Sequence, residues 1–411
     1  MRSADPAALR DWAASGAMAL TGRRDGPPLA APGDPAGQVR RQLDEFADLT
    51  RQRTGERPAL PGVALLGERA AIARLARNAP YSCGGAFRAI GTMDGWLGLS
   101  LPRDSDRQLV PALIETEPAA GSWEAVAAWA ARRTSAVAAA RARLLGLACA
   151  PIPDGSPVST RAPVLVTPGG PRRRRPDRPR VVDLTSLWAG PLCAHLLGLT
   201  GAEVVKVESA QRPDGARFGP PAFFDLLHAG HRAVALDLTS AADLAALRRL
   251  IDSADLVLES SRTRALRQAG IEAEEVIEHG TSWLSITGYG RASDWIGFGD
   301  DVAAGAGLVV PEDDGPLPCG DALADPLTGV AAAAAAAAAL LDRRARLIDV
   351  SMHDVALAAA GGRPPPHRVV RSGTTWWVET EDGEFPVAEP VGRPVTDRAP
   401  AVGADTAELL R

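Results

Sequence analysis

The sequence predicts an α/β protein, with a Rossmann-like, doubly wound parallel sheet in its larger part and a smaller α+β domain. Three observations support this class. Short β-branched runs alternate with helical patterns after residue 180, whereas helical patterns flank a single strand pair in the first half. A stretch rich in Pro, Gly and Arg separates these two patterns.

The first half predicts the smaller α+β module. Apolar residues at helical spacing indicate helices within residues 40–52 and 122–146. Residues 84–101 indicate two strands joined by a turn at Met93-Asp94-Gly95.

Residues 159–180 predict an exposed linker, because they combine Pro, Gly and Arg without sustained periodicity. A nucleic-acid patch is the alternative interpretation of the arginine run 172–175. Prolines flank that run and no basic or aromatic surroundings support it, so a solvated linker is favoured.

The second half predicts the parallel sheet. Buried strands are expected at 180–184, 203–208, 232–238, 254–260 and 282–290, with helices at 190–201, 240–254 and 264–280. Such right-handed βαβ units bind ligands at the carboxyl ends of their strands. The first turn, residues 184–191, lacks the G-x-G-x-x-G motif, so it does not indicate dinucleotide binding. Pro191 suits the start of a helix, where free backbone N–H groups would face a ligand.

Composition favours a small-molecule ligand. The chain has 411 residues and a formal net charge of −5, which demands neither nucleic acid nor a membrane surface. Its four cysteines show no C-x-x-C spacing, so we expect no metal site and a reducing, cytoplasmic location. We expect no signal peptide, and the apolar run 330–341 falls short of the roughly 20 residues that span a bilayer.

Asp325 is the first candidate for chemistry. Residues 305–330 parallel residues 15–39: each has an apolar run, a D-G-P turn and an Asp-Pro pair, so Asp34 and Asp325 occupy equivalent places. Asp-Pro before a helical run is also typical of an N-cap, and local sequence alone favours that role for both residues.

Eight stretches in order resemble the class III CoA-transferases (CaiB/BaiF), which include formyl-CoA transferase and alpha-methylacyl-CoA racemase. They include "VVDLTSLWAGPL", "GFGDDVAAGAGL", "GDALADPLTGV" and "LIDVSMHDVAL", and they run from residue 180 to 411. The resemblance implies an acyl-CoA:carboxylate CoA-transferase in acyl-CoA metabolism. Its substrates would be an acyl-CoA and a carboxylic acid acceptor, with no tightly bound cofactor.

The resemblance makes Asp325 the nucleophile, which forms an acyl-aspartyl anhydride and then an aspartyl-CoA thioester. Asp300 stands where the family's transferases have an acidic residue and its racemase has a histidine. A solvated turn is the alternative for Asp300. An acyl-CoA isomerase or racemase and a catalytically lapsed CoA-binding protein are the alternatives for the whole chain.

The resemblance also implies CoA contacts from the first turn, from two arginines and from a serine pair: Leu187, Trp188, Ala189, Arg212, Arg232, Ser260 and Ser261. Several positions depart from the family. Trp188 replaces a glutamine, which hints at a less polar acyl group than formyl. Ser260 and Ser261 replace an Asn-Phe pair, and residues 83–85 are a faint counterpart of the glycine-rich loop that covers the site.

The resemblance further implies a rearranged chain. Residues 1–158 resemble a partial copy taken from the family's later part, including its small domain, followed by the linker 159–180, the CoA-binding catalytic domain 181–362 and a C-terminal segment 363–411. Family members are interlocked homodimers with sites between subunits. This chain is therefore expected to form either a homodimer or a pseudo-dimeric monomer.

Overall fold

The computed structural model describes residues 6–116, 123–155, 161–172, 177–260 and 263–410. Its centre is a seven-stranded sheet in the order β4–β12–β9–β8–β5–β6–β7. The strands are β4 (Val164–Pro171), β5 (Arg180–Leu184), β6 (Glu203–Ser209), β7 (Arg232–Leu236), β8 (Leu256–Glu259), β9 (Ser282–Thr287) and β12 (Arg344–Ser351). Every neighbouring pair is parallel except β12 with β4, so the expected doubly wound α/β fold is confirmed.

Helices connect and cover these strands. They are α8 (Ala189–Leu199), α9 (Pro221–His228), α10 (Ala241–Ser253), α11 (Thr263–Gln268), α12 (Ala273–Glu278), α13 (Gly299–Gly305), α14 (Ala324–Leu341), α15 (Met352–Ala359) and α16 (Thr406–Leu409), with the short helix η3 (Gly215–Phe218). Both faces of the sheet are covered, because Val181 and Val182, neighbours with opposite side-chain directions on β5, are both buried in separate clusters.

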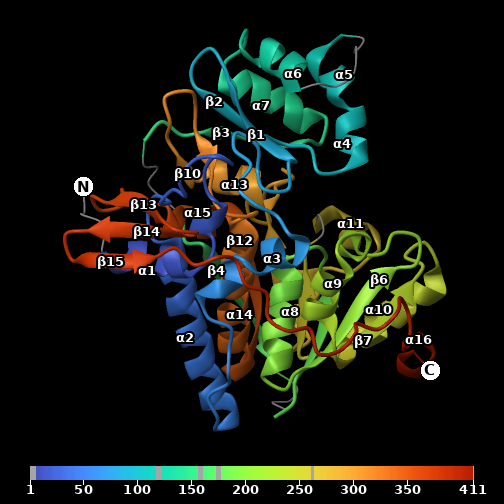
Figure 1. Cartoon of the computed structure of the whole chain (residues 1–411). Helices are drawn as coiled ribbons and strands as arrows, with labels where there is room; N and C mark the ends of the chain where they lie inside the picture. Colours follow the sequence, from blue (N-terminus) through green and yellow to red (C-terminus); the bar gives the residue numbers. More distant parts are fainter. Residues whose placement is uncertain (1–5, 117–122, 156–160, 173–176, 261–262, 411) are drawn as a thin grey trace.

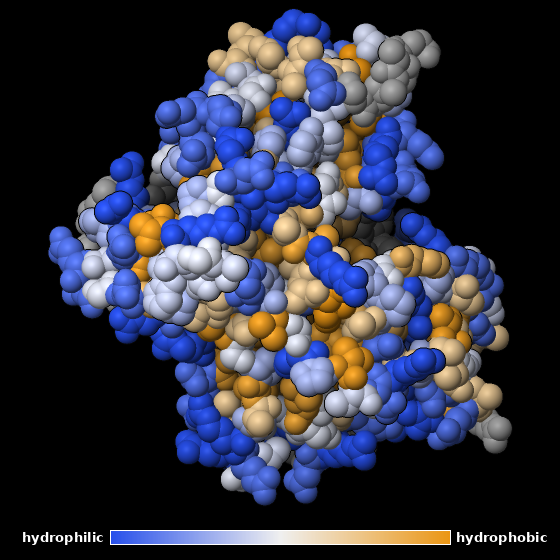
Figure 2. Space-filling model, in the orientation of Figure 1, coloured by the Kyte–Doolittle hydropathy of each residue, from blue (hydrophilic) through white to orange (hydrophobic). Residues whose placement is uncertain are grey.

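The first half divides between two places. Strands β1 (Phe87–Gly91), β2 (Trp96–Ser100) and β3 (Ala148–Ile152) form an antiparallel sheet with α4 (Asp104–Gln108), α5 (Val110–Ile114), α6 (Trp123–Ala130) and α7 (Ser135–Leu144). This small module stands at the top of Figure 1, and the surface is hollowed between it and the lobe of β6 and β7 (Figure 2). The expected strand pair is confirmed, and β3 extends it.

The segment before the small module packs instead on helices that cover the large sheet. It contains α1 (Pro6–Ala14), η1 (Met18–Leu20), α2 (Pro35–Thr54), η2 (Val63–Leu66) and α3 (Glu68–Ala73). Helix α2 lies along α14 (Figure 1). The C-terminal segment forms a three-stranded sheet of β13 (Arg368–Ser372), β14 (Thr375–Thr380) and β15 (Gly383–Pro386). It is followed by α16, which lies beside β7. A separate two-stranded sheet pairs β10 (Val309–Val310) with β11 (Leu317–Pro318).

Part of the expected linker is a strand. Residues 164–171 form β4, which pairs antiparallel with β12 at the edge of the sheet, where Pro168 is tolerated. Gly170 is needed because a Cβ there would lie 2.1 Å from the carbonyl oxygen of Glu278. The side chain of Arg172 is 2% exposed, and its guanidinium lies 3.6 Å from Asp255, so it is not a solvated linker residue. Linker-like composition here reflects close packing at a sheet edge, and residues 159–160 and 173–176 lie outside the described ranges.

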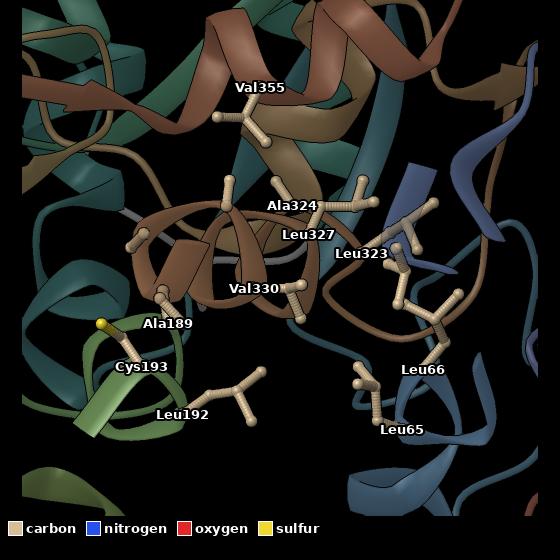
Figure 3. Packing of buried hydrophobic residues seen from close by; sticks show 14 of the residues in the cluster. Leu65, Leu66, Ala189, Leu192, Cys193, Leu323, Ala324, Leu327, Val330 and Val355 are labelled. Atoms are coloured by element: carbon tan, nitrogen blue, oxygen red, sulfur yellow. The ribbon is translucent and has the colours of Figure 1, made fainter. Parts of the chain in front are cut away.

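The alanine-rich helix α14 is the central helix of the core. It lies between α2 and α8, where small side chains allow close approach; a Cβ on Gly329 would lie 2.7 Å from the carbonyl oxygen of Ala189. Figure 3 shows Leu65 and Leu66 of the first half facing the start of this helix. Its length and apolarity would suffice to cross a membrane, but 78% of it is buried inside the protein, as expected of a core helix.

The two equivalent aspartates differ at their helices. Asp34 caps α2, because its carboxylate accepts from the Gly37 N–H at 2.9 Å. In α14 the N-cap is Leu323, and Asp325 is already the second helical residue. The capping interpretation of Asp325 is therefore wrong: the helix begins earlier than the Asp-Pro pair indicates, and the Asp325 N–H closes a turn on the Ala322 carbonyl at 2.9 Å.

Candidate active site

A cavity of about 240 Å³ lies at the carboxyl ends of the parallel strands. The chain leaves β5 for β6 and β7 on one side and returns to β8 on the other, so β5 and β8 flank the topological switch point. Ser186 and Leu187 follow β5, Ser260 follows β8, Gly288 follows β9 and Met352 follows β12; all five line the cavity. The cavity therefore occupies the place where doubly wound sheets bind ligands.

Asp325 is half-buried in the wall of this cavity. The start of α14 presents it toward α13, where a Cβ on Gly299 would lie 2.3 Å from a carboxylate oxygen of Asp325. Only glycine leaves room for the carboxylate at that point. The N–H of Ala189, at the start of α8, faces the same carboxylate.

Two further carboxylates lie behind Asp325. Asp300, on α13, accepts from the N–H of Ala322 at 2.9 Å, and the backbone of Ala322 has a φ of 44°. Asp321 is 1% exposed and binds the guanidinium of Arg69 through both oxygens, with one distance of 2.9 Å. The wall behind Asp325 is thus an acidic cluster of three carboxylates that faces one guanidinium.

Burial makes these carboxyls weaker acids than usual. Removal from water raises the pKa of Asp325 to about 7; Arg69 lowers it, and the neighbouring Asp300 and Asp321 raise it further. Burial likewise raises the pKa of Asp300 to about 6. The pKa values of both carboxyls therefore lie near neutral pH, which is typical of catalytic carboxyls.

A strained turn at Leu187 forms another part of the wall. Leu187 has a φ of 70°, a left-handed conformation that is unfavourable for a leucine. Its N–H donates to Asp214 at 3.0 Å, and Lys206 donates to the second oxygen of Asp214 at 2.9 Å. Lys206 is 1% exposed and also binds the carbonyl of Thr185. The sole lysine of the chain therefore helps to fix this turn.

Some of the residues expected to bind CoA line the cavity, and others lie outside it. Leu187, Ala189 and Ser260 line the cavity, and the Ser260 hydroxyl accepts from the N–H of Ser186 at 3.3 Å. Trp188 does not line it: its ring packs edge-on against Phe223 and under the Arg69 guanidinium, 5.1 Å away. Ser261 lies outside the described residues.

The two expected phosphate-binding arginines lie elsewhere. Arg212 is exposed in the turn after β6 and is not part of the cavity wall. Arg232, on β7, forms ion pairs at 2.7 Å with Asp405 and with Glu408 of the C-terminal segment. The arginine of the cavity wall is Arg103 of the small module, which stacks over Phe298 at 5.3 Å.

Sequence reasoning missed Arg69, Asp321 and Arg103. Asp321 lies in the same motif as Asp325, four residues earlier, so its proximity was a readable signal. Arg69 and Arg103 carry no local signal, because the first half reaches the site only through folding. The faint glycine-loop counterpart does lie against the site: the Cys83 thiol donates to the Gly320 carbonyl at 3.3 Å, and Ser82 faces Asp300.

No metal site is evident in the described part of the chain, where no three His, Cys, Asp or Glu side chains are arranged to hold an ion. Leu187 and Trp295, which are 42% and 49% exposed, give the cavity apolar surface beside the carboxylate. The arrangement suits a ligand that presents an electrophilic carbon to Asp325 and an apolar chain to the wall.

Comparison with known proteins shows similarity to CoA-transferases. Residues 178–374 match the sequence model of CoA-transferase family III. The chain is 30% identical over 220 residues to a succinate–glutarate CoA-transferase of Agrobacterium fabrum, covering 45% of this chain and 55% of the relative. It is 27% identical over 197 residues to a formyl-CoA:oxalate CoA-transferase of Escherichia coli, covering 43% and 47%. The chain spans about half the length of these curated relatives.

Solved structures are also similar over part of the chain. A hypothetical protein of Mycobacterium tuberculosis is 28% identical with a TM-score of 0.44, covering 53% of this chain and 66% of that one. A CaiB/BaiF family protein of Brucella suis is 23% identical with a TM-score of 0.43, covering 50% and 63%.

Proposed function

We propose that this chain, a member of CoA-transferase family III, transfers CoA from an acyl-CoA to a carboxylic acid with Asp325 as the nucleophile. The observation that carries the proposal is the position of Asp325: half-buried, in the wall of a cavity at the switch point of the sheet. The family uses CoA thioesters as substrates, and the reaction proposed below involves no tightly bound cofactor.

Four exchanges complete the proposed reaction. The Asp325 carboxylate attacks the thioester carbonyl, the C–S bond breaks, and an acyl-aspartyl anhydride and CoA thiolate form. The thiolate attacks the aspartyl carbonyl, releasing the first acid and leaving an aspartyl-CoA thioester. The acceptor carboxylate then attacks this thioester, and the released thiolate attacks the acceptor's acyl carbon. Asp325 returns as a carboxylate, and no net proton or electron is exchanged.

The surroundings of Asp325 fit these steps. The N–H of Ala189 faces the carboxylate at the start of α8, where the helix dipole favours negative charge. The cavity of about 240 Å³ suits the acyl and thioester end of the substrate rather than a whole CoA molecule. Cys83, Cys149, Cys193 and Cys319 are buried free thiols, which fits our proposal of a cytoplasmic protein.

The geometry favours transfer over racemisation. A racemase needs two acid/base groups that face opposite sides of one carbon. Asp300, the expected second group, does not line the cavity; its carboxylate binds the Ala322 N–H instead. Asp300 is therefore proposed as an electrostatic neighbour of Asp325.

A labelled acceptor tests the activity directly. The protein is incubated with succinyl-CoA and ¹³C-labelled glutarate or oxalate, the acids in the names of its relatives, and thioesters are separated by mass. A labelled CoA thioester supports the proposal. Deuterium uptake at the α-carbon of the acyl-CoA in D₂O, without a new thioester, would instead assign an isomerase. Measurable CoA binding without either reaction would identify a lapsed enzyme.

The reaction should lose rate in mild acid. Because burial raises the pKa of Asp325 to about 7 and only the carboxylate attacks, kcat/KM should fall as pH drops below about 7. We expect an acid limb centred there when kcat/KM is measured from about pH 5 to about pH 9 at constant ionic strength. A kcat/KM that stays level down to about pH 5, as the ordinary aspartate pKa of about 3.9 would give, would contradict the environment described for Asp325.

The site should function within one chain. Arg69, from the first half, and Asp321, from the second, meet in a single polypeptide, so no partner subunit is needed to join them. We therefore expect a mixture of the Asp325→Asn and Arg69→Ala proteins to show, after subunit exchange, no more activity than the Arg69→Ala protein contributes alone. Recovery in the mixture would show that the halves of the site come from different subunits, and the solution mass of the wild-type protein checks the same point.

A further inference from the structure

Arg69 lies where the first half of the chain meets the acidic cluster. It is the second residue of α3, outside the residues that match the family. Its guanidinium binds Asp321 with two parallel contacts and rests 5.1 Å from the Trp188 ring. Both planar partners fix its orientation, because a guanidinium fork matches a carboxylate and stacks on aromatic faces.

Arg69 is the cation that Asp300, Asp321 and Asp325 face together. Ionising all three carboxylates near a single guanidinium carries a high free-energy cost, because the site is buried. Among the other titratable neighbours, Asp301 faces Asp300 from α13, and burial raises the pKa of Asp301 to about 7. Cys83 faces Asp300 and Asp321, and burial raises the pKa of its thiol, so it adds no charge.

We infer that Arg69 is a positioning residue for the proposed transfer: it binds Asp321, packs on Trp188 and thereby places its positive charge beside the acidic cluster that contains Asp325. The inference rests on the proposed function for its kinetic consequence, but not for its electrostatic one. The inference gives the first half of the chain a role in the proposed reaction in addition to its packing on the core.

A purely structural role makes a different prediction. If the Arg69–Asp321 pair only anchored α3, its loss would lower activity equally at every pH. If Arg69 supports the charge of Asp325, its loss raises the pKa of Asp325, and activity returns once the pH exceeds the new value. The pH dependence of the defect therefore separates the two roles.

The kinetic test compares the wild type with Arg69→Met and Arg69→Lys. We expect Arg69→Met to move the acid limb of kcat/KM upward by about one pH unit, which lowers the rate about fivefold at about pH 7 and about tenfold at lower pH. At about pH 9 most of the rate should return, while the KM for acyl-CoA changes little. Arg69→Lys, which keeps the charge, should restore most of the limb.

Arg393→Met is the matched control. Arg393 binds Glu68, the residue before Arg69, and its side chain is 27% exposed against 29% for Arg69. Its loss weakens the anchoring of α3 without touching the acidic cluster. The acid limb should stay in place in this variant; a limb that moved as far as in Arg69→Met would overturn the inference.

A titration without substrate keeps the inference separate from the proposed function. The carboxyl carbons of ¹³C-labelled aspartate are followed by NMR, and Asp325→Asn identifies the Asp325 signal by its disappearance. We expect Arg69→Met to raise the Asp325 midpoint. An unchanged midpoint would overturn the role of Arg69 whatever the activity, whereas a raised midpoint in a protein that transfers no CoA would refute only the proposed reaction.

Discussion

Replacing Asp325 with asparagine should lower CoA transfer by at least about 10³-fold, because the amide cannot form the anhydride. CoA binding should change little, since the cavity wall keeps its shape. Stability should hold or rise, because burial raises the pKa of this carboxyl to about 7 and the neutral amide avoids that cost. Steady-state transfer, CoA binding by calorimetry and urea unfolding measure the three effects.

Asp34→Ala is the control that separates catalysis from capping. Asp34 caps α2 and pairs with Arg41 at 2.6 Å, so its loss should cost about 1 kcal/mol of unfolding free energy. Transfer by this variant should remain at the wild-type rate. If Asp34→Ala and Asp325→Asn lowered turnover to the same degree, the assignment of Asp325 as nucleophile would be wrong.

Lys206→Met should destabilise the fold by about 3–5 kcal/mol, because it leaves two buried carboxylates without their cation. The Lys206 ammonium lies 2.9 Å from Asp214 and 3.7 Å from Asp183, and all three side chains are at most 1% exposed. The variant should also raise the KM for acyl-CoA, since Asp214 holds the Leu187 turn at the cavity. Urea unfolding monitored by tryptophan fluorescence gives the free energy.

Arg180→Met is the matched control for Lys206. Arg180 begins β5 and pairs with Glu203 at 3.0 Å, but these side chains are 30% and 27% exposed. Solvent screens such a pair, so its loss should cost less than about 1 kcal/mol. Equal losses in the two variants would mean that the buried network under the Leu187 turn contributes no more than a surface ion pair.

The sequence predicted the parallel sheet well, because its strands are buried on both faces and leave continuous β-branched runs. The strands expected at 180–184 and 203–208 correspond to β5 and β6 almost residue for residue. The same pattern predicted a ligand site at the carboxyl ends of the strands, and the structure places the cavity there, at the ends of β5 and β8.

Three features could not be predicted from local pattern. Strand β4 has the composition of a linker because Gly170 packs against Glu278 and residues 165–168 are exposed. Asp325 looks like a cap, yet α14 begins at Ala324, one residue before it. Arg69 meets Asp321 across 252 residues, a contact that only the folded chain brings about.

A covalent adduct on Asp325 is the most direct test of the proposed function. The protein is incubated with succinyl-CoA, treated with hydroxylamine or quenched in acid, and its peptides are examined by mass spectrometry. The proposal predicts a hydroxamate or a CoA thioester on the peptide that contains Asp325, absent from the Asp325→Asn protein. An adduct on another residue, or none in a protein that binds and transfers CoA, would contradict it.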